Sequence, residues 1–115
     1  MDATTAALQS PKTIDAYQAL YDTLGRAYWD ATTIDTKDLI QGVREAIYDI
    51  ITELDEAQLD ANTTALLALQ PKIEDTNTAL NKIKDSINEI TKNINTATTV
   101  VSAISKVVAI MAPLL

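Results

Sequence analysis

The chain has 115 residues and a net charge of −7, and its length suits one domain with a hydrophobic core. Its nine Lys and Arg are dispersed, which argues against nucleic acid as a partner because phosphate binding needs a basic surface. Histidine and cysteine are absent, which excludes histidine-based catalysis, histidine metal sites and disulfides. We expect no enzyme, no cofactor and no bound metal. Only two glycines and three prolines interrupt the chain, which favours a few long elements.

The first predicted helix covers residues 11–31. Ser10 and Pro11 indicate its start, because serine is a good N-cap and proline fits the first helical position. Apolar residues then recur at alternating spacings of three and four, which places them on one helical face: Ile14, Tyr17, Tyr21, Leu24 and Tyr28. The residues that follow, 32–36, predict a short connection that carries the next cap.

The second predicted helix covers residues 36–69. Its inward face has the same spacing and consists of Ile40, Val43, Ile47, Ile50 and Leu54. Two endings fit the pattern: continuation to Leu69, which we favour, or a break at 60–62 with Asn62 as the cap of a new helix. Gln70 and Pro71 would then reverse the chain, since the residue before a proline is pushed out of the helical region.

The third predicted helix covers residues 72–112 and has the most regular pattern in the chain. Residues that are all apolar except Thr76 keep 3–4 spacing from Ile73 to Leu115: Ile73, Thr76, Leu80, Ile83, Ile87, Ile90, Ile94, Ala97, Val101, Ile104, Val108, Met111 and Leu115. One unbroken helix of this length would measure roughly 60 Å. Ile and Val repeated at such positions are typical of a coiled coil.

These elements predict an all-α fold with a single domain over residues 1–115. Short connections make consecutive helices antiparallel neighbours, so we expect an elongated three-helix bundle or coiled-coil hairpin with one very long C-terminal helix. The first helix is too short to cover the whole hairpin. Residues 57–84 should therefore form a projecting tip of only two helices.

Acidic residues concentrate in the middle of the chain, where residues 45–71 contain six Asp and Glu but no Lys or Arg. A solvated helix face is the ordinary interpretation of such a run, and a basic protein partner is the sharper one. Carboxylate pairs such as Glu53 with Glu56 could hold Mg²⁺ or act as acid and base only inside a pocket, so we interpret them as solvated.

Two apolar segments exceed what one neighbouring helix can cover: the leucines before Pro71 and the stretch from Ala97 to the C-terminus, whose one charge is Lys106. Such a wide apolar face favours burial against several helices, including those of a partner. The candidate partner-binding residues are Leu66, Leu67, Leu69, Val107, Val108, Ile110, Met111, Leu114 and Leu115.

The leading hypothesis is a non-enzymatic helical interaction or structural protein that acts by coiled-coil packing, as a homo-oligomer or with a protein partner. One alternative is a membrane-active protein that uses the apolar C-terminal helix, in a chain loosely similar to parts of α-helical pore-forming toxins. A second alternative is a small acidic inhibitor or immunity protein. No small-molecule substrate is expected. The N-terminal residues lack a conventional secretory signal, which favours the cytoplasm or secretion by a signal-independent route.

Overall fold

The computed structural model describes residues 11–59 and 63–111, and within these ranges the chain is helical apart from short turns, with no strand. This confirms the all-α prediction. The helices are α2 (Pro11–Asp30), α3 (Ile34–Leu59), α4 (Thr63–Ala68), α5 (Gln70–Asp85), α6 (Ile87–Ile90) and α7 (Ile94–Met111).

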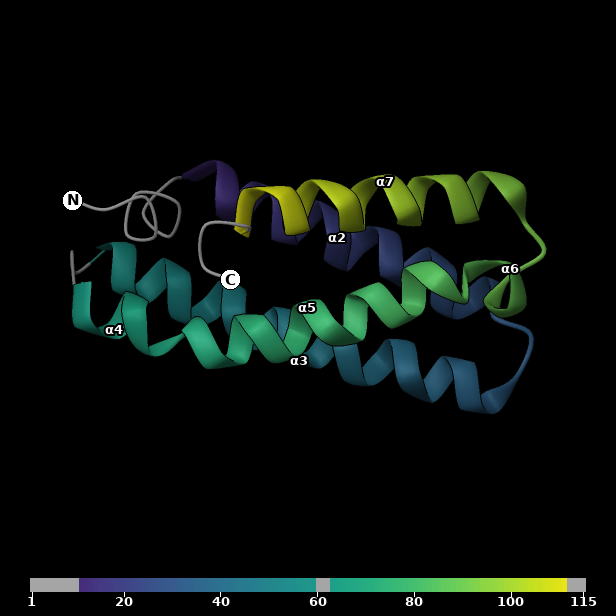
Figure 1. Cartoon of the computed structure of the whole chain (residues 1–115), viewed down its shortest axis with the longest axis horizontal. Helices are drawn as coiled ribbons and strands as arrows, with labels where there is room; N and C mark the ends of the chain where they lie inside the picture. The colour runs from purple at the N-terminus through teal and green to yellow at the C-terminus, as the bar shows by residue number, and fades with distance from the viewer. Residues whose placement is uncertain (1–10, 60–62, 112–115) are drawn as a thin grey trace.

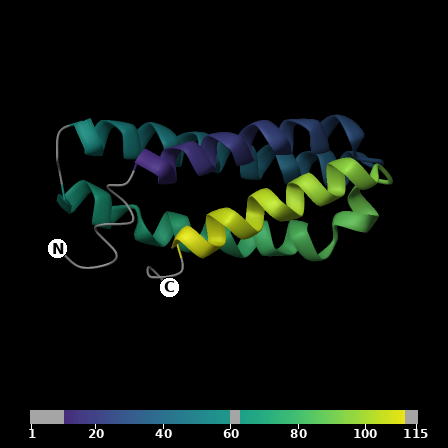
Figure 2. The same ribbon diagram turned by 90° about the horizontal axis from the view of Figure 1, so that it is seen from above.

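The helices form an antiparallel bundle of four helical rows (Figure 1). Helix α2 runs beside α3, α3 beside the row made by α4, α5 and α6, and that row beside α7. Helix α7 also packs against α2, which closes the ring, as the view from above shows (Figure 2). The bundle measures 43 × 20 × 19 Å, which is shorter than the rod of roughly 60 Å that one unbroken C-terminal helix would have formed.

The very long C-terminal helix predicted over residues 72–112 is wrong. The helical row ends at Ile90, and Thr91 has an extended backbone with φ −139° and ψ 146°. Asn93 then caps the next helix, because its Oδ1 accepts a hydrogen bond from the amide of Thr96 at 3.2 Å. The chain therefore turns back at residues 91–93, and α7 lies antiparallel to α5. The second half of the predicted third helix is therefore a separate helix, α7, which forms a fourth row of the bundle.

The position of this turn also changes which side chains of α7 face inward. Ile94, which belonged to the predicted inward face, is 78 % exposed at the helix start. Ala97 and Ile104 are buried as predicted, whereas Val101 and Val108 are only partly buried, and Val100 and Val107 are buried in their place. Because α7 packs against both α2 and α5, its wide apolar face is used within the chain.

The end of the second helix also differs from the favoured prediction. Helix α3 ends at Leu59 and the separate helix α4 begins at Thr63, so the predicted range 36–69 is wrong at its C-terminal end. The alternative break at 60–62 fits this, while Asn62 and Ser10 lie outside the described residues. Pro71 does not reverse the chain: it stands within the first turn of α5, where its missing N–H costs little.

The predicted two-helix tip over residues 57–84 is likewise wrong for most of its length. Helix α5 packs against α3 on one side and α7 on the other, so it belongs to the body of the bundle. The predicted range of the first helix, 11–31, differs from that of α2 by one residue at the C-terminal end.

The core is mainly aliphatic, but it also contains Tyr17, Asn77 and several buried threonines. The largest fully buried side chains come from all four rows of the bundle: Tyr17, Leu20, Leu24, Ile40, Ile47, Ile50, Leu54, Ile73, Leu80, Ile83 and Ile104. None of the helices in the described ranges is long and apolar enough to cross a membrane.

Three tertiary hydrogen bonds connect the chain around the turns at residues 31–33 and 91–93, which we call the loop end of the bundle. The amide of Thr32 donates to the carbonyl oxygen of Ile90 at 3.0 Å, and its hydroxyl donates to that of Glu89 at 3.4 Å. The hydroxyl of Thr96 donates to the carboxylate of Asp30 at 2.5 Å. The loop end therefore fixes α2, α3 and α7 relative to one another.

Candidate interaction surface on helix α3

The outer face of α3 carries a line of exposed carboxylates, which we call the acidic stripe: Asp38, Glu45, Asp49 and Glu56. Spacings of seven, four and seven residues place them on one side of a helix. Glu53 stands one turn after Asp49 and is also exposed. The acidic run seen in the sequence thus becomes a surface feature of a single helix.

The two cations of α3 point away from this stripe, toward α2. The Lys37 ammonium donates to the carbonyl oxygen of Tyr28 at 2.6 Å and lies 4.7 Å from the centre of that ring. The Arg44 guanidinium lies 4.1 Å above the ring of Tyr21, and its Nε donates to the Tyr21 carbonyl oxygen at 3.2 Å. Both cation–π contacts hold positive charge at the α2–α3 boundary.

Gly25 gives the Arg44 guanidinium the room for this position. A Cβ at Gly25 would lie 3.1 Å from Nη2 of Arg44, which is closer than an ordinary carbon–nitrogen contact. The glycine of α2 therefore helps to direct a positive charge of α3 away from the acidic stripe.

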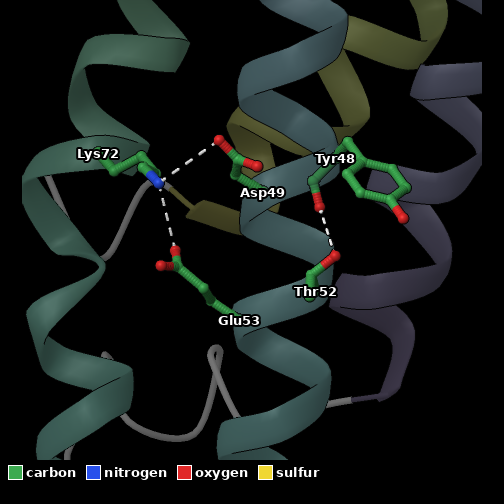
Figure 3. A network of polar contacts seen from close by, with 5 residues as sticks. All are labelled: Tyr48, Asp49, Thr52, Glu53 and Lys72. Carbon is green, nitrogen blue, oxygen red and sulfur yellow. Dashed lines mark hydrogen bonds and ion pairs between the residues drawn. The ribbon is translucent and has the colours of Figure 1, made fainter.

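Lys72 of α5 is the cation that does reach the stripe (Figure 3). Its Nζ lies 3.3 Å from Oε2 of Glu53 and 3.9 Å from Oδ2 of Asp49. These side chains are well exposed, so the pairs contribute little to the free energy of unfolding. Within the described residues no ion pair involves Asp38, Glu45 or Glu56.

Tyr48 stands beside the stripe and is 59 % exposed. In Figure 3 its ring lies on the side of α3 opposite Lys72, toward α2. The ring is tilted against that of Tyr21, with 6.2 Å between the centroids. Together with Glu45 and Asp49 it borders a shallow hollow of about 440 Å³ between α2 and α3. Arg44 lines the same hollow, and Asp49 is paired with Lys72, so Glu45 is the carboxylate of this hollow that has no ion pair among the described residues. An exposed aromatic ring beside such a carboxylate is suited to hold a cationic side chain.

The structure places the predicted partner-binding residues in three different environments. Leu69 and Val107 are core residues, only 6 % and 1 % exposed, so they face the interior of the bundle. Val108 and Ile110 are partly buried against the core, and Leu67 is 40 % exposed. The side chains of Leu66 and Met111, and residues Leu114 and Leu115 as a whole, lie outside the described residues. The described members of the set do not form one continuous apolar surface.

The loop end carries an apolar surface that the sequence patterns did not indicate. Trp29, Ile34 and Ile94 are 78 %, 76 % and 78 % exposed, and they stand at the end of α2, the start of α3 and the start of α7. We call these three residues the loop-end triad. Ile34 and Ile94 are the first residues of their helices, so no preceding helical turn covers their side chains.

Within the described ranges, no group of three or more Asp and Glu is placed to hold a metal ion. No protein-family model, curated protein or solved structure matches this chain. Two surfaces are distinguished by exposure and charge: the acidic stripe with Tyr48, and the loop-end triad.

Proposed function

We propose that this chain is a non-enzymatic helical interaction protein that binds a basic protein partner through the acidic stripe and Tyr48. The observation that carries the proposal is the separation of charge on α3. Lys37 and Arg44 are held against α2, whereas the carboxylates face solvent. A helix whose cations are withdrawn in this way presents one sign of charge to an approaching surface.

The partner's Lys and Arg would pair with the carboxylates, and Tyr48 would supply apolar area and a cation–π contact. Tyrosine is frequent among the residues that contribute most to the binding energy of protein interfaces. Opposite charges also speed the encounter of two proteins, and added salt reduces this effect because it screens charge within about 10 Å at 0.1 M. A small acidic inhibitor that covers the basic site of its target is one form of this function.

Photo-crosslinking tests the proposal directly. A benzophenone amino acid replaces Tyr48 in one variant and the exposed Gln18 of α2 in a control, and each is irradiated in an extract of the cells that naturally make the chain. We expect one discrete product at position 48 that is absent at position 18. The double substitution Glu45→Lys and Asp49→Lys should remove it, and mass spectrometry should identify a partner with a basic surface. A product that survives the charge reversal would contradict the proposal.

The loop-end triad supports a second candidate function, self-association. Three large apolar side chains, each more than three-quarters exposed, stand at one end of the bundle. Exposed apolar residues gathered in this way often mark contacts with another protein. If two copies meet end to end there, light scattering should give the mass of a dimer that falls to a monomer in Trp29→Ser/Ile94→Ser. Leu59→Ser, which changes an exposed leucine at the far end of α3, is the control.

A further inference from the structure

A second groove lies between α3 and α5, which run side by side in the bundle (Figure 1). It has a volume of about 410 Å³, and its lining includes Leu39, Gly42 and Ala46 from α3 and Ala79 from α5. Asp38 on α3 and Asp75 on α5 also line it, and both are exposed. The groove therefore combines an apolar floor with one carboxylate from each helix.

Small side chains keep this groove open. A Cβ at Gly42 would have no atom within 4 Å, so the space above the glycine is empty. Leu39 is 39 % exposed although it faces a neighbouring helix, and Ala46 and Ala79 are only partly buried. Glycine within a helix is less favourable than alanine, and no described residue comes close enough to Gly42 to require a glycine there.

We propose that this groove accepts an amphipathic basic helix of the partner, an inference that builds on the proposed function. Apolar side chains of the partner helix would enter above Gly42. Its Lys and Arg would pair with Asp38 and Asp75. Since α5 also carries the exposed Lys82, the basic residues of the partner should be densest on the side of α3, where the acidic stripe continues through Glu45.

The charges and dimensions of the groove specify this occupant. From Leu39 to Ala46 the floor covers two helical turns, roughly 10 Å, which matches apolar anchors at positions i, i+3 or i+4, and i+7 of a docked helix. An apolar floor between carboxylates disfavours an acidic or wholly polar segment, because neither would satisfy both the floor and the charges.

Two synthetic peptides of identical composition test this inference. The first places Leu at i, i+3, i+4 and i+7 with Lys and Arg elsewhere, and the second disperses the same residues so that no apolar face forms. Fluorescence anisotropy of the labelled peptides with the full chain measures both affinities. We expect the patterned peptide to bind at least ten-fold tighter, on the order of the gain from one well-buried leucine.

Substitutions in the chain then locate the site. Gly42→Leu fills the groove from within and should abolish the preference for the patterned peptide, whereas Gln18→Leu on α2 should preserve it. Asp38→Asn with Asp75→Asn should weaken binding of the patterned peptide at least three-fold, in line with modest surface charge pairs. Circular dichroism verifies that each variant keeps its helix content.

Equal affinity for both peptides, or an unchanged preference in Gly42→Leu, would overturn the groove assignment. Neither result affects the crosslink at Tyr48, so the crosslinking experiment tests the proposed function independently of the groove. Failure of both experiments would remove the basic partner altogether.

Discussion

The hydroxyl of Thr96 donates a hydrogen bond to the carboxylate of Asp30, with 2.5 Å between Oγ1 and Oδ2. The bond joins the first turn of α7 to the last residue of α2, and Thr96 is only 8 % exposed. Hydrogen bonds to charged groups stabilise proteins more than neutral ones do. This contact therefore anchors the fourth helical row, which the sequence patterns did not predict.

We expect Thr96→Val to lower the free energy of unfolding by about 1.5 to 3 kcal/mol, because the substitution removes the bond and keeps the side-chain shape. Thr98→Val, at an exposed position of the same helix, should change it by less than about 0.5 kcal/mol. Urea unfolding followed by circular dichroism gives both values. Equal effects in the two variants would show that the Asp30 contact contributes nothing.

Asn77 is a polar side chain in the core, 2 % exposed, and its amide nitrogen and oxygen have no hydrogen-bond partner among the described residues. We expect Asn77→Leu to raise the free energy of unfolding by about 1 to 3 kcal/mol, since burying an unpaired amide is unfavourable. Asn81→Leu, on the exposed side of α5, is the matched control and should have little effect. Destabilisation by Asn77→Leu would instead indicate internal water bound to the amide.

Tyr17 predicts a loss of stability in alkali. Burial raises the pKa of its hydroxyl above the ordinary value, so the folded chain keeps a proton that the unfolded chain releases. The free energy of unfolding should therefore fall as the pH rises above about 10, the usual tyrosine pKa. Tyr17→Phe should reduce this fall relative to the unsubstituted chain, because it removes the buried hydroxyl. Unfolding curves measured across this pH range decide the matter.

The two glycines offer a matched comparison within helices. Gly42→Ala should raise the free energy of unfolding by about 0.5 to 1 kcal/mol, because its Cβ meets open space and alanine favours the helix. Gly25→Ala should gain less or lose stability, since its Cβ would displace the Arg44 guanidinium from the ring of Tyr21. Thermal unfolding of both variants tests this order. A larger gain at Gly25 would show that the Arg44 contact has little energetic value.

Sequence periodicity predicted the helices and much of the core because burial follows spacing. Tyr17, Ile47 and Ile83 were all assigned to inward faces, and all are fully buried. The same periodicity misplaced Ile94, because a 3–4 spacing that continues through a turn looks identical to one that continues through a helix. The local signal was Asn93, a favourable N-cap whose side chain accepts from the amide three residues later.

From the sequence, only the acidic composition of the candidate surface could be predicted, not the arrangement of its side chains. The run of acids from Glu45 onward indicated a charged face, but the directions of Lys37 and Arg44 depend on the carbonyl oxygens and rings that α2 places beside them. The exposure of Trp29 likewise depends on which helices end nearby. These are properties of tertiary packing, and a periodic pattern along one helix contains no information about them.

The packing of α2 against α7 has a kinetic consequence. Every other pairing joins helical rows that are consecutive in the chain. Helical bundles with such local contacts fold quickly, in microseconds to milliseconds. The α2–α7 pairing closes a loop of most of the chain, so its entropic cost favours late formation. We expect Thr96→Val to accelerate unfolding while leaving the folding rate nearly constant, which stopped-flow measurements would reveal as a φ-value near zero.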